Sequence, residues 1–343
     1  MRVVLVGCGN MAEGWLKAIQ ESPLLKARIT LVGLVDLNIA AAQALAAKFG
    51  LSNISLCADL QESIAVNKPD ALFDVTVPEA RPIIVRAGLE AGLHVLSEKP
   101  MAPNMQVARD LMALADRKGL SFSIAQNRRY KQGIRRVEAF LRKGGIGEIT
   151  GLHADFFIGA RFGGFREEMD HVLLLDMAIH TFDAARFMSN QKPLRVQCIE
   201  ANPNGSWYGQ DASAFATFEM SNNVIFSYRG SWCAEGSNTS WDASWRITGT
   251  KGTLHWDGEQ AISAHIATGE EAFLRDSVET IVPKIDDITV TQEHASVIAA
   301  FLDGVKNNHR PETDSADNLH SLAMVFAAIE SAKRGCKIDI SSN

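Results

Sequence analysis

The chain has 343 residues, of which 46 % are hydrophobic, and its 34 Lys and Arg residues against 40 Asp and Glu residues give a net charge of −6. At about 150 residues per domain, this length predicts two domains. The ordinary apolar fraction excludes disorder as the main state. An acidic chain also lacks the cationic field of a general nucleic-acid or anionic-membrane binder, so we expect neither partner.

The cysteines and the N-terminus indicate where the protein resides. Five scattered cysteines without a C-x-x-C pair favour a reducing compartment over a disulfide framework. Only two residues precede the first apolar run, which Gly7 interrupts, so we expect no signal peptide. No apolar stretch approaches the roughly 20 residues of a membrane helix. We therefore expect a cytoplasmic protein.

The first third of the chain alternates short β-branched runs with longer helical patterns, which is typical of a parallel α/β sheet. The runs are almost continuously apolar, as in strands that are covered on both faces. The expected strands are residues 3–6, 30–35, 71–75, 94–97 and 121–125, and the expected helices are residues 12–20, 40–49 and 105–118. These elements predict an α/β domain over residues 1–125.

The pattern changes after residue 125 to one of many strands and few helices. Hairpin signals at residues 221–223 and 249–252 predict antiparallel pairing, in an antiparallel or mixed sheet. The expected strands are residues 149–158, 194–201, 213–219, 224–230 and 244–248, and the expected helices are residues 134–143, 292–306 and 316–333. We therefore predict an α+β second domain over residues 126–343.

The chain begins with a strand, a G-x-G-x-x-A turn and the start of a helix. A dinucleotide site needs Gly7 for the tight turn, Gly9 for close approach of the pyrophosphate, and a small residue at Ala12 for helix packing. Backbone N–H groups at the helix start, at Asn10 and Met11, would then hold the phosphates. Taken alone, glycines in a turn often serve only the turn.

Asp36 strengthens this interpretation because it ends the second expected strand, 24 residues after Ala12. An acidic residue there bonds the adenosine ribose hydroxyls of a dinucleotide. Its carboxylate repels a 2′-phosphate and Leu37 supplies no compensating cation, so we expect NAD rather than NADP. Asp36 could alternatively be a turn or helix-capping residue, and a cation from another loop could still admit NADP.

Two further motifs carry groups suited to catalysis. Glu98 and Lys99 follow the strand at 94–97, at the sheet edge where ligands bind. The alternative is that they are two solvated charges at the end of a strand. Asp176 and His180 interrupt an otherwise apolar helical segment at i and i+4, and so lie on one face.

Burying Asp176 and His180 is costly unless they pair or line a wet cleft. The structural alternative is that Asp176 and His180 hydrogen-bond only to each other, or that they form a polar stripe that Asp183 continues. We expect no metal, because D-x-x-x-H lacks a convincing third ligand and His171 would be a forced choice.

Together these motifs resemble the glucose-fructose oxidoreductase / inositol dehydrogenase / MocA-like family of NAD(P)-dependent enzymes. The resemblance extends over essentially the whole chain through the turn at 7–12, Asp36, D-x-x-x-H and the segments 74–78, 91–100 and 127–130. It implies a Rossmann domain followed by an α+β domain with a large open, mostly antiparallel sheet. Such sheets commonly support oligomers, so we expect a homodimer or homotetramer through the C-terminal sheet.

The resemblance also implies roles for individual residues. The family's catalytic set corresponds here to Lys99, Asp176 and His180, and its cofactor contacts correspond to Thr76, Pro78, Glu98, Lys99, Asn127 and Arg128. The chain departs from the family at Pro82, where members often carry His, and at residues 172–175, where they often carry glycines. The second departure indicates a changed active-site wall.

The expected reaction is hydride transfer between the nicotinamide and a secondary alcohol or ketone of a sugar, sugar derivative or cyclitol. His180 suits acid/base work near neutral pH, Asp176 would orient it, and Lys99 would stabilise the developing alkoxide. Arg161 and Arg166 precede the catalytic helix and either reach an acidic substrate or are solvated.

Two other functions remain open. One is an NAD-dependent glycosidase with no net redox change. The other is a non-catalytic NAD-binding regulator, for which loss of the lysine or histidine is expected, whereas all three catalytic residues are present. The basic cluster at residues 128–136 is interpreted as a cofactor-proximal turn followed by a solvated helix face.

Overall fold

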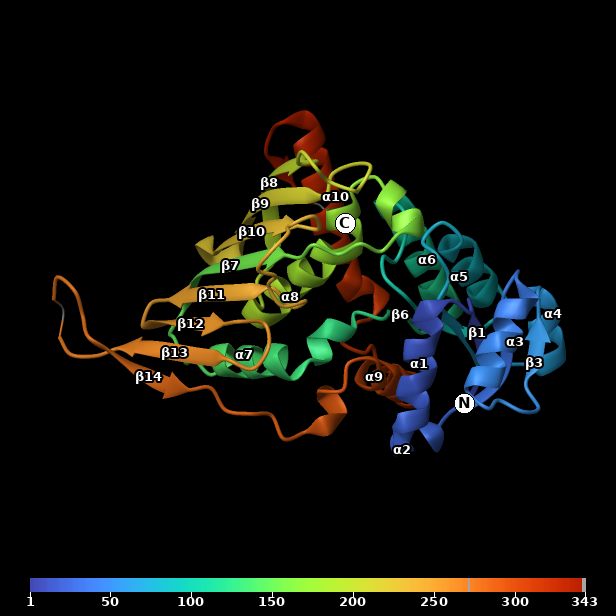
Figure 1. Cartoon of the computed structure of the whole chain (residues 1–343). Coiled ribbons are helices and arrows are strands. Elements are labelled where there is room, and N and C mark those ends of the chain that lie inside the picture. Colours follow the sequence, from blue (N-terminus) through green and yellow to red (C-terminus); the bar gives the residue numbers. More distant parts are fainter. Residues whose placement is uncertain (271, 341–343) are drawn as a thin grey trace. The chain divides into compact units, whose positions relative to one another are not determined.

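The computed structural model describes residues 1–270 and 272–340, and the chain forms two compact units (Figure 1). Unit 1 comprises Met1–Tyr130 and Gln292–Leu319, and unit 2 comprises Lys131–Thr291 and His320–Asn343. The segment Gln292–Leu319 thus joins the N-terminal residues, whereas the predicted boundary after residue 125 places it in the second domain.

Helix α9 (His294–Asn307) explains why this late segment belongs to unit 1. Its Phe301 ring lies 6.0 Å from the ring of Phe73, between centroids. Asp303 of the same helix accepts a hydrogen bond of 2.6 Å from Arg28. The sequence pattern located the helix, but these contacts over more than 200 residues of chain are not local and were not predicted.

Unit 1 is built on six parallel strands in the order β3-β2-β1-β4-β5-β6. All four residues of β4 are buried, as are the residues of β1 after Arg2, because both faces of the sheet are covered. The strands are β1 (Arg2–Val6), β2 (Thr30–Val35), β3 (Ser55–Cys57), β4 (Ala71–Asp74), β5 (His94–Ser97) and β6 (Phe122–Ile124). Five of them confirm the predicted strands, whereas the three-residue β3 was missed.

The strand order of unit 1 reverses between β1 and β4, which is the position where doubly wound sheets bind dinucleotides. The helices of this unit are α1 (Asn10–Glu21), α2 (Pro23–Lys26), α3 (Ile39–Lys48), α4 (Leu60–Asn67), α5 (Arg81–Glu90), α6 (Met105–Lys118) and α9. For α6 the predicted bounds are confirmed, because the Asn104 side chain caps its start and Gly119, at φ 64°, ends it. None of the helices in the described residues is both long and apolar enough to cross a membrane.

Unit 2 contains a nine-stranded sheet in the order β14-β13-β12-β11-β7-β10-β9-β8-β15. Its pairs are antiparallel except β7 with β10, so the predicted mostly antiparallel sheet is confirmed. The strands are β7 (Ile149–Phe157), β8 (Pro193–Ala201), β9 (Ser213–Met220), β10 (Ile225–Ser231), β11 (Ser244–Gly249), β12 (Gly252–Trp256), β13 (Ile262–Ala267), β14 (Ser277–Ile281) and β15 (Ile338–Asp339). The last four were not predicted.

One face of this sheet is packed against helices and the other is open. Phe182 of α8 (Ile179–Ser189) places its ring 4.8 Å from Phe218 and 5.3 Å from Tyr228, between centroids. On the opposite face the paired residues Ile199 and Phe215 are 64 % and 43 % exposed. The remaining helices of this unit are α7 (Gln132–Arg142) and the part of α10 (Ser315–Arg334) that follows Leu319.

The basic cluster after residue 127 corrects one expectation. Arg135 of α7 is 8 % exposed, so it does not belong to a solvated helix face, and Arg129 in the preceding turn is 4 % exposed. Arg129 forms an ion pair with Asp317, and Arg135 lies over the Phe187 ring at 4.7 Å from its centroid. Arginine tolerates burial where its planar head is paired or stacked, and the sequence alone did not reveal these partners.

Candidate functional site

The glycine-rich turn after β1 has the backbone geometry that a phosphate cradle requires. Gly7 has a φ of +93°, and a Cβ atom there would lie 2.7 Å from the carbonyl carbon and oxygen of Val75. A Cβ at Gly9 would meet nothing within 4 Å, so the backbone at the start of α1 is open to approach. Ala12 is fully buried. This backbone geometry is what a pyrophosphate site requires, and the contact itself stays a prediction.

Asp36 connects the end of β2 to this turn. Its carboxylate accepts hydrogen bonds of 2.8 Å from the backbone N–H of Cys8 and of Asn38. Asp36 is thus a turn residue, which was the alternative interpretation. Its hydrogen bond to Cys8 also stabilises the glycine-rich turn. The ribose contact stays a prediction. Burial and the Asp36 charge raise the pKa of the Cys8 thiol to about 12, so this thiol stays protonated.

A buried ion pair holds the two loops that carry the predicted cofactor contacts after β4 and β5. Asp74 is fully buried, and its Oδ2 lies 3.0 Å from Nε of Arg81. Arg81 also donates to the carbonyl oxygens of Thr76 at 2.6 Å and Pro100 at 2.7 Å, and Ser97 donates to Asp74 at 2.6 Å. These bonds link the segment with Thr76 and Pro78 to the segment with Lys99. The role of Arg81 was not predicted.

Glu98 is the centre of a second buried network in unit 1. Its Oε1 accepts a 2.7 Å hydrogen bond from Trp15 and lies 3.6 Å from Nε2 of His294, whose Nδ1 is 3.4 Å from the side-chain amide of Asn127. Glu98 is 6 % exposed, so the alternative of a solvated charge is wrong for this residue, whereas Lys99 is half-buried.

The surroundings of Glu98 keep its carboxylate ionised. Burial opposes ionisation, but the hydrogen bonds and charge of His294, the Trp15 bond and the charge of Lys99 outweigh it and lower the pKa of Glu98. Trp15 and His294 could not be predicted as partners of Glu98, because α1 and α9 are far apart in the chain.

In unit 2, Asp176 and His180 occupy the start of the predicted helix. This start is a π-helix, Leu173–Ala178, which continues as α8. The Asp176 side chain is 13 % exposed and its Oδ2 lies 3.2 Å from Nε of Arg166, while His180 is 7 % exposed. Single π turns inside α-helices occur often at functional sites. The apolar composition predicted the burial but not the wider turn.

The polar stripe of Asp176 and His180 continues to Asp183, whose side chain is hydrogen-bonded within the protein. Asp183 is 1 % exposed and accepts a 2.7 Å hydrogen bond from Ser321 of α10. Arg186 donates to the same Ser321 oxygen at 2.7 Å and lies 3.7 Å from Asp183. This part of the stripe therefore binds α8 to α10.

The two arginines before the helix differ in their surroundings. Arg161 is exposed, pairs with Glu235 at 2.6 Å and stacks on Trp207 with its guanidinium carbon 3.6 Å from the ring centroid. Arg166 lies over Phe162 and Phe165, at 5.2 and 4.9 Å from their ring centroids, and contacts Asp176. Arg166 is thus the arginine tied to a proposed catalytic residue.

Comparison with known proteins identifies the family. Residues 1–126 match the model described as the oxidoreductase family with an NAD-binding Rossmann fold, and residues 134–255 match that of the GFO/IDH/MocA C-terminal domain. The chain belongs to the Gfo/Idh/MocA family. It is therefore an NAD-binding oxidoreductase, and the resemblance seen in its motifs is confirmed.

Individual members of the Gfo/Idh/MocA family align with nearly the whole chain at low identity. D-apiose dehydrogenase of Paraburkholderia graminis is 23 % identical over 98 % of this chain and 89 % of its own length. Inositol 2-dehydrogenase of Rhizobium meliloti is 24 % identical over 99 % of each chain. The crystal structure of an oxidoreductase from Agrobacterium radiobacter in complex with NAD+, L-tartaric acid and magnesium shares the fold, with a TM-score of 0.85 at 20 % identity over 99 % of this chain and 98 % of that one.

Proposed function

We propose that this protein is an NAD-dependent dehydrogenase that transfers a hydride between the nicotinamide and a secondary alcohol or ketone of a sugar, sugar derivative or cyclitol. The names of the two relatives, a D-apiose dehydrogenase and an inositol 2-dehydrogenase, support this substrate class. Both align with almost all of this chain.

The proposed cofactor site lies at the carboxyl edge of the parallel sheet. The backbone of Gly7, Gly9, Asn10, Met11 and Ala12 would hold the pyrophosphate, and Asp36 would bond the ribose. The positive φ at Gly7 and the open space at Gly9 support this fit. Because Asp36 is anionic and the adjacent Leu37 is apolar, we propose NAD as the preferred dinucleotide. The remaining proposed contacts come from Thr76, Pro78, Glu98, Lys99, Asn127 and Arg128.

Oxidation of an alcohol removes a hydride from carbon and a proton from oxygen. The bound nicotinamide supplies the hydride acceptor. His180 takes the hydroxyl proton at its imidazole, Asp176 orients that imidazole and favours its protonated form, and Lys99 stabilises the alkoxide that develops on the substrate oxygen. In the reduction direction His180 returns the proton. Arg161 is the proposed additional contact for an acidic substrate.

The observation that carries this assignment is the placement of His180. It is 7 % exposed in a helical start that is otherwise apolar apart from Asp176. Asp176 is held by Arg166 in the same part of unit 2, and a catalytic role accounts for an imidazole and a carboxylate among these apolar residues. The network around Glu98 would in turn hold the loop that carries Lys99.

A homo-oligomer formed through the nine-stranded sheet belongs to the same proposal. The exposed pair Ile199 and Phe215 on β8 and β9 supports it, because large apolar side chains on an open sheet face are suited to an interface. Measurement of the molecular mass in solution tests this part.

The function is tested by incubating the protein with NAD and a panel of sugars, inositols and sugar acids while following NADH absorbance. NADH formation with at least one polyol is expected. Hydrolysis of aryl glycosides without accumulation of NADH would instead identify a glycosidase. Binding of NAD with no turnover of any panel member would favour a regulator.

A further inference from the structure

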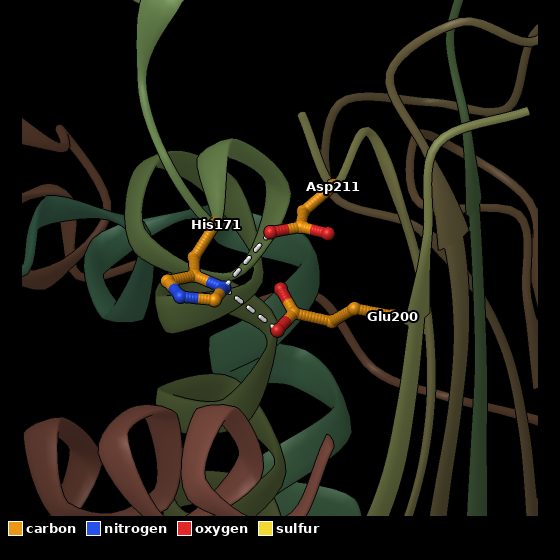
Figure 2. Close-up of side chains that lie close together, drawn as sticks. All are labelled: His171, Glu200 and Asp211. Atoms are coloured by element: carbon orange, nitrogen blue, oxygen red, sulfur yellow. Dashed lines mark hydrogen bonds and ion pairs between the residues drawn. The ribbon is translucent and has the colours of Figure 1, made fainter. Parts of the chain in front are cut away.

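A cluster of three ionisable side chains lies in unit 2, outside the residues proposed for catalysis. His171 precedes the π-helix, Glu200 is on β8, and Asp211 lies in the loop before β9. Figure 2 shows the three side chains converging, with Nδ1 of His171 2.8 Å from Oε2 of Glu200 and 3.1 Å from Oδ2 of Asp211. One ligand atom from each residue lies within 4.8 Å of the others.

The Glu200 side chain holds an oxygen that the protein does not satisfy. This side chain is only 4 % exposed. Its Oε1 is buried and has no hydrogen-bond partner, and in Figure 2 the free oxygen lies on the side of Asp211. A buried, unpaired carboxylate oxygen costs free energy. Its presence indicates that a group outside the chain completes the cluster.

The charges of the cluster point to a cation. Glu200 and Asp211 carry two negative charges, which a neutral His171 leaves unbalanced and a protonated one balances only in part. Lys333 contributes a favourable charge to Glu200 but forms no ion pair with either carboxylate within the described residues. A divalent cation would neutralise both carboxylates and leave the imidazole in the neutral form that metals bind.

We propose that His171, Glu200 and Asp211 bind one divalent transition-metal ion, with Zn²⁺ the favoured ion. Zinc binds imidazole nitrogen and carboxylate oxygen, and three protein ligands leave a fourth position for water or another ligand. Magnesium and calcium prefer ligand sets made of oxygen alone.

The distances in the cluster suit this ion. Zinc bonds of about 2.0–2.2 Å place tetrahedral ligand atoms roughly 3.3–3.6 Å apart. The observed separations of 2.8 and 3.1 Å would have to increase by about 0.2–0.8 Å to match these values. Glu200 can turn either oxygen toward the ion.

The ion would stabilise the beginning of the helix that carries Asp176 and His180. His171 lies just before that helix, and its carbonyl oxygen accepts the N–H of Leu175 at 3.0 Å, so it holds the first turn. Binding would connect this turn to β8 and to the loop before β9. The site is independent of the proposed reaction, because its ligands are not the proposed catalytic residues.

The test uses the full-length protein without a histidine tag, stripped with a chelator and dialysed separately against Zn²⁺, Mn²⁺, Co²⁺ or Mg²⁺. Metal content and melting temperature are then measured for the wild type, His171→Ala and Glu200→Gln. Glu219→Gln on β9 and His255→Ala on β12 are matched controls outside the cluster.

The wild type and both controls are expected to retain about one Zn²⁺ per chain and to melt several degrees higher with the ion than without it. In His171→Ala and Glu200→Gln, zinc affinity should fall by at least about a hundredfold, since outer-shell changes alone cost 10–100-fold. Glu200→Gln has nearly the same shape as the native side chain and keeps the comparison valid if His171→Ala fails to fold. A wild type that retains no metal, or zinc affinities equal in all five proteins, would show that the cluster is only a hydrogen-bonded ion triad.

Discussion

Replacement of Arg81 by Met probes the buried ion pair that holds the loops after β4 and β5. The substitution keeps most of the side-chain volume but leaves the Asp74 carboxylate, which is fully buried, without its cation. It also removes the donors to the carbonyl oxygens of Thr76 and Pro100. Breaking one side of a buried pair costs about 3–5 kcal/mol. For a domain of about 150–250 residues this predicts a fall in Tm of roughly 6–20 °C.

Urea unfolding followed by circular dichroism measures this loss, and hydrogen exchange of the β4 and β5 amides locates it in unit 1. The matched control is Lys48→Met, which removes an exposed pair with Glu13 in the same unit and should cost no more than about 1 kcal/mol. The double variant Asp74→Asn/Arg81→Met should recover much of the loss, because no unpaired charge remains. If Arg81→Met were as stable as Lys48→Met, the buried pair would not hold these loops as we argue.

Two further variants examine the cofactor side of the protein. Asp36→Asn keeps an oxygen that can accept the Cys8 N–H but loses the negative charge. We expect it to weaken NAD binding and to reduce the preference for NAD over NADP. An unchanged ratio of the two Kd values would contradict the proposed ribose contact. Glu98→Gln removes a carboxylate whose pKa is lowered below 4.5 on folding. That carboxylate stabilises the fold above pH 4.5, and its contribution is lost as pH falls through the folded-state pKa. The difference in stability between Glu98→Gln and wild type should therefore shrink below pH 4.5. A difference that stays constant with pH would contradict the lowered pKa of Glu98.

The parallel sheet could be predicted because its strands form continuous apolar runs. The turns and helix ends between them are marked by glycines whose backbone conformation is set locally. Gly7 and Gly119 both adopt positive φ, as the turn and the helix end require. The end of the second sheet was missed, since β13 and β14 are half-buried or exposed strands without a strong apolar pattern. Short β3 gave too few residues for a periodicity.

The candidate site was predictable only where its residues are close in sequence. Asp176 and His180 share one helical segment, and Glu98 and Lys99 share one strand end. The partners Trp15 and His294 contact Glu98 from helices that are distant in the chain. In the sequence, Arg81 cannot be told from any other charged residue at a helix start. The side chains of His171, Glu200 and Asp211 converge only after β8 and β9 pair, so spacing along the chain could not reveal that cluster.

The most direct test of the central claim is the rate of hydride transfer in a single turnover, measured for wild type and His180→Ala with a substrate found in the panel. The matched control is His309→Ala, which changes an exposed histidine in unit 1. We expect a rate at least about a hundredfold lower in His180→Ala, with NAD still bound, and a wild-type rate in His309→Ala. A wild-type rate in His180→Ala would contradict the role of His180 as the acid/base.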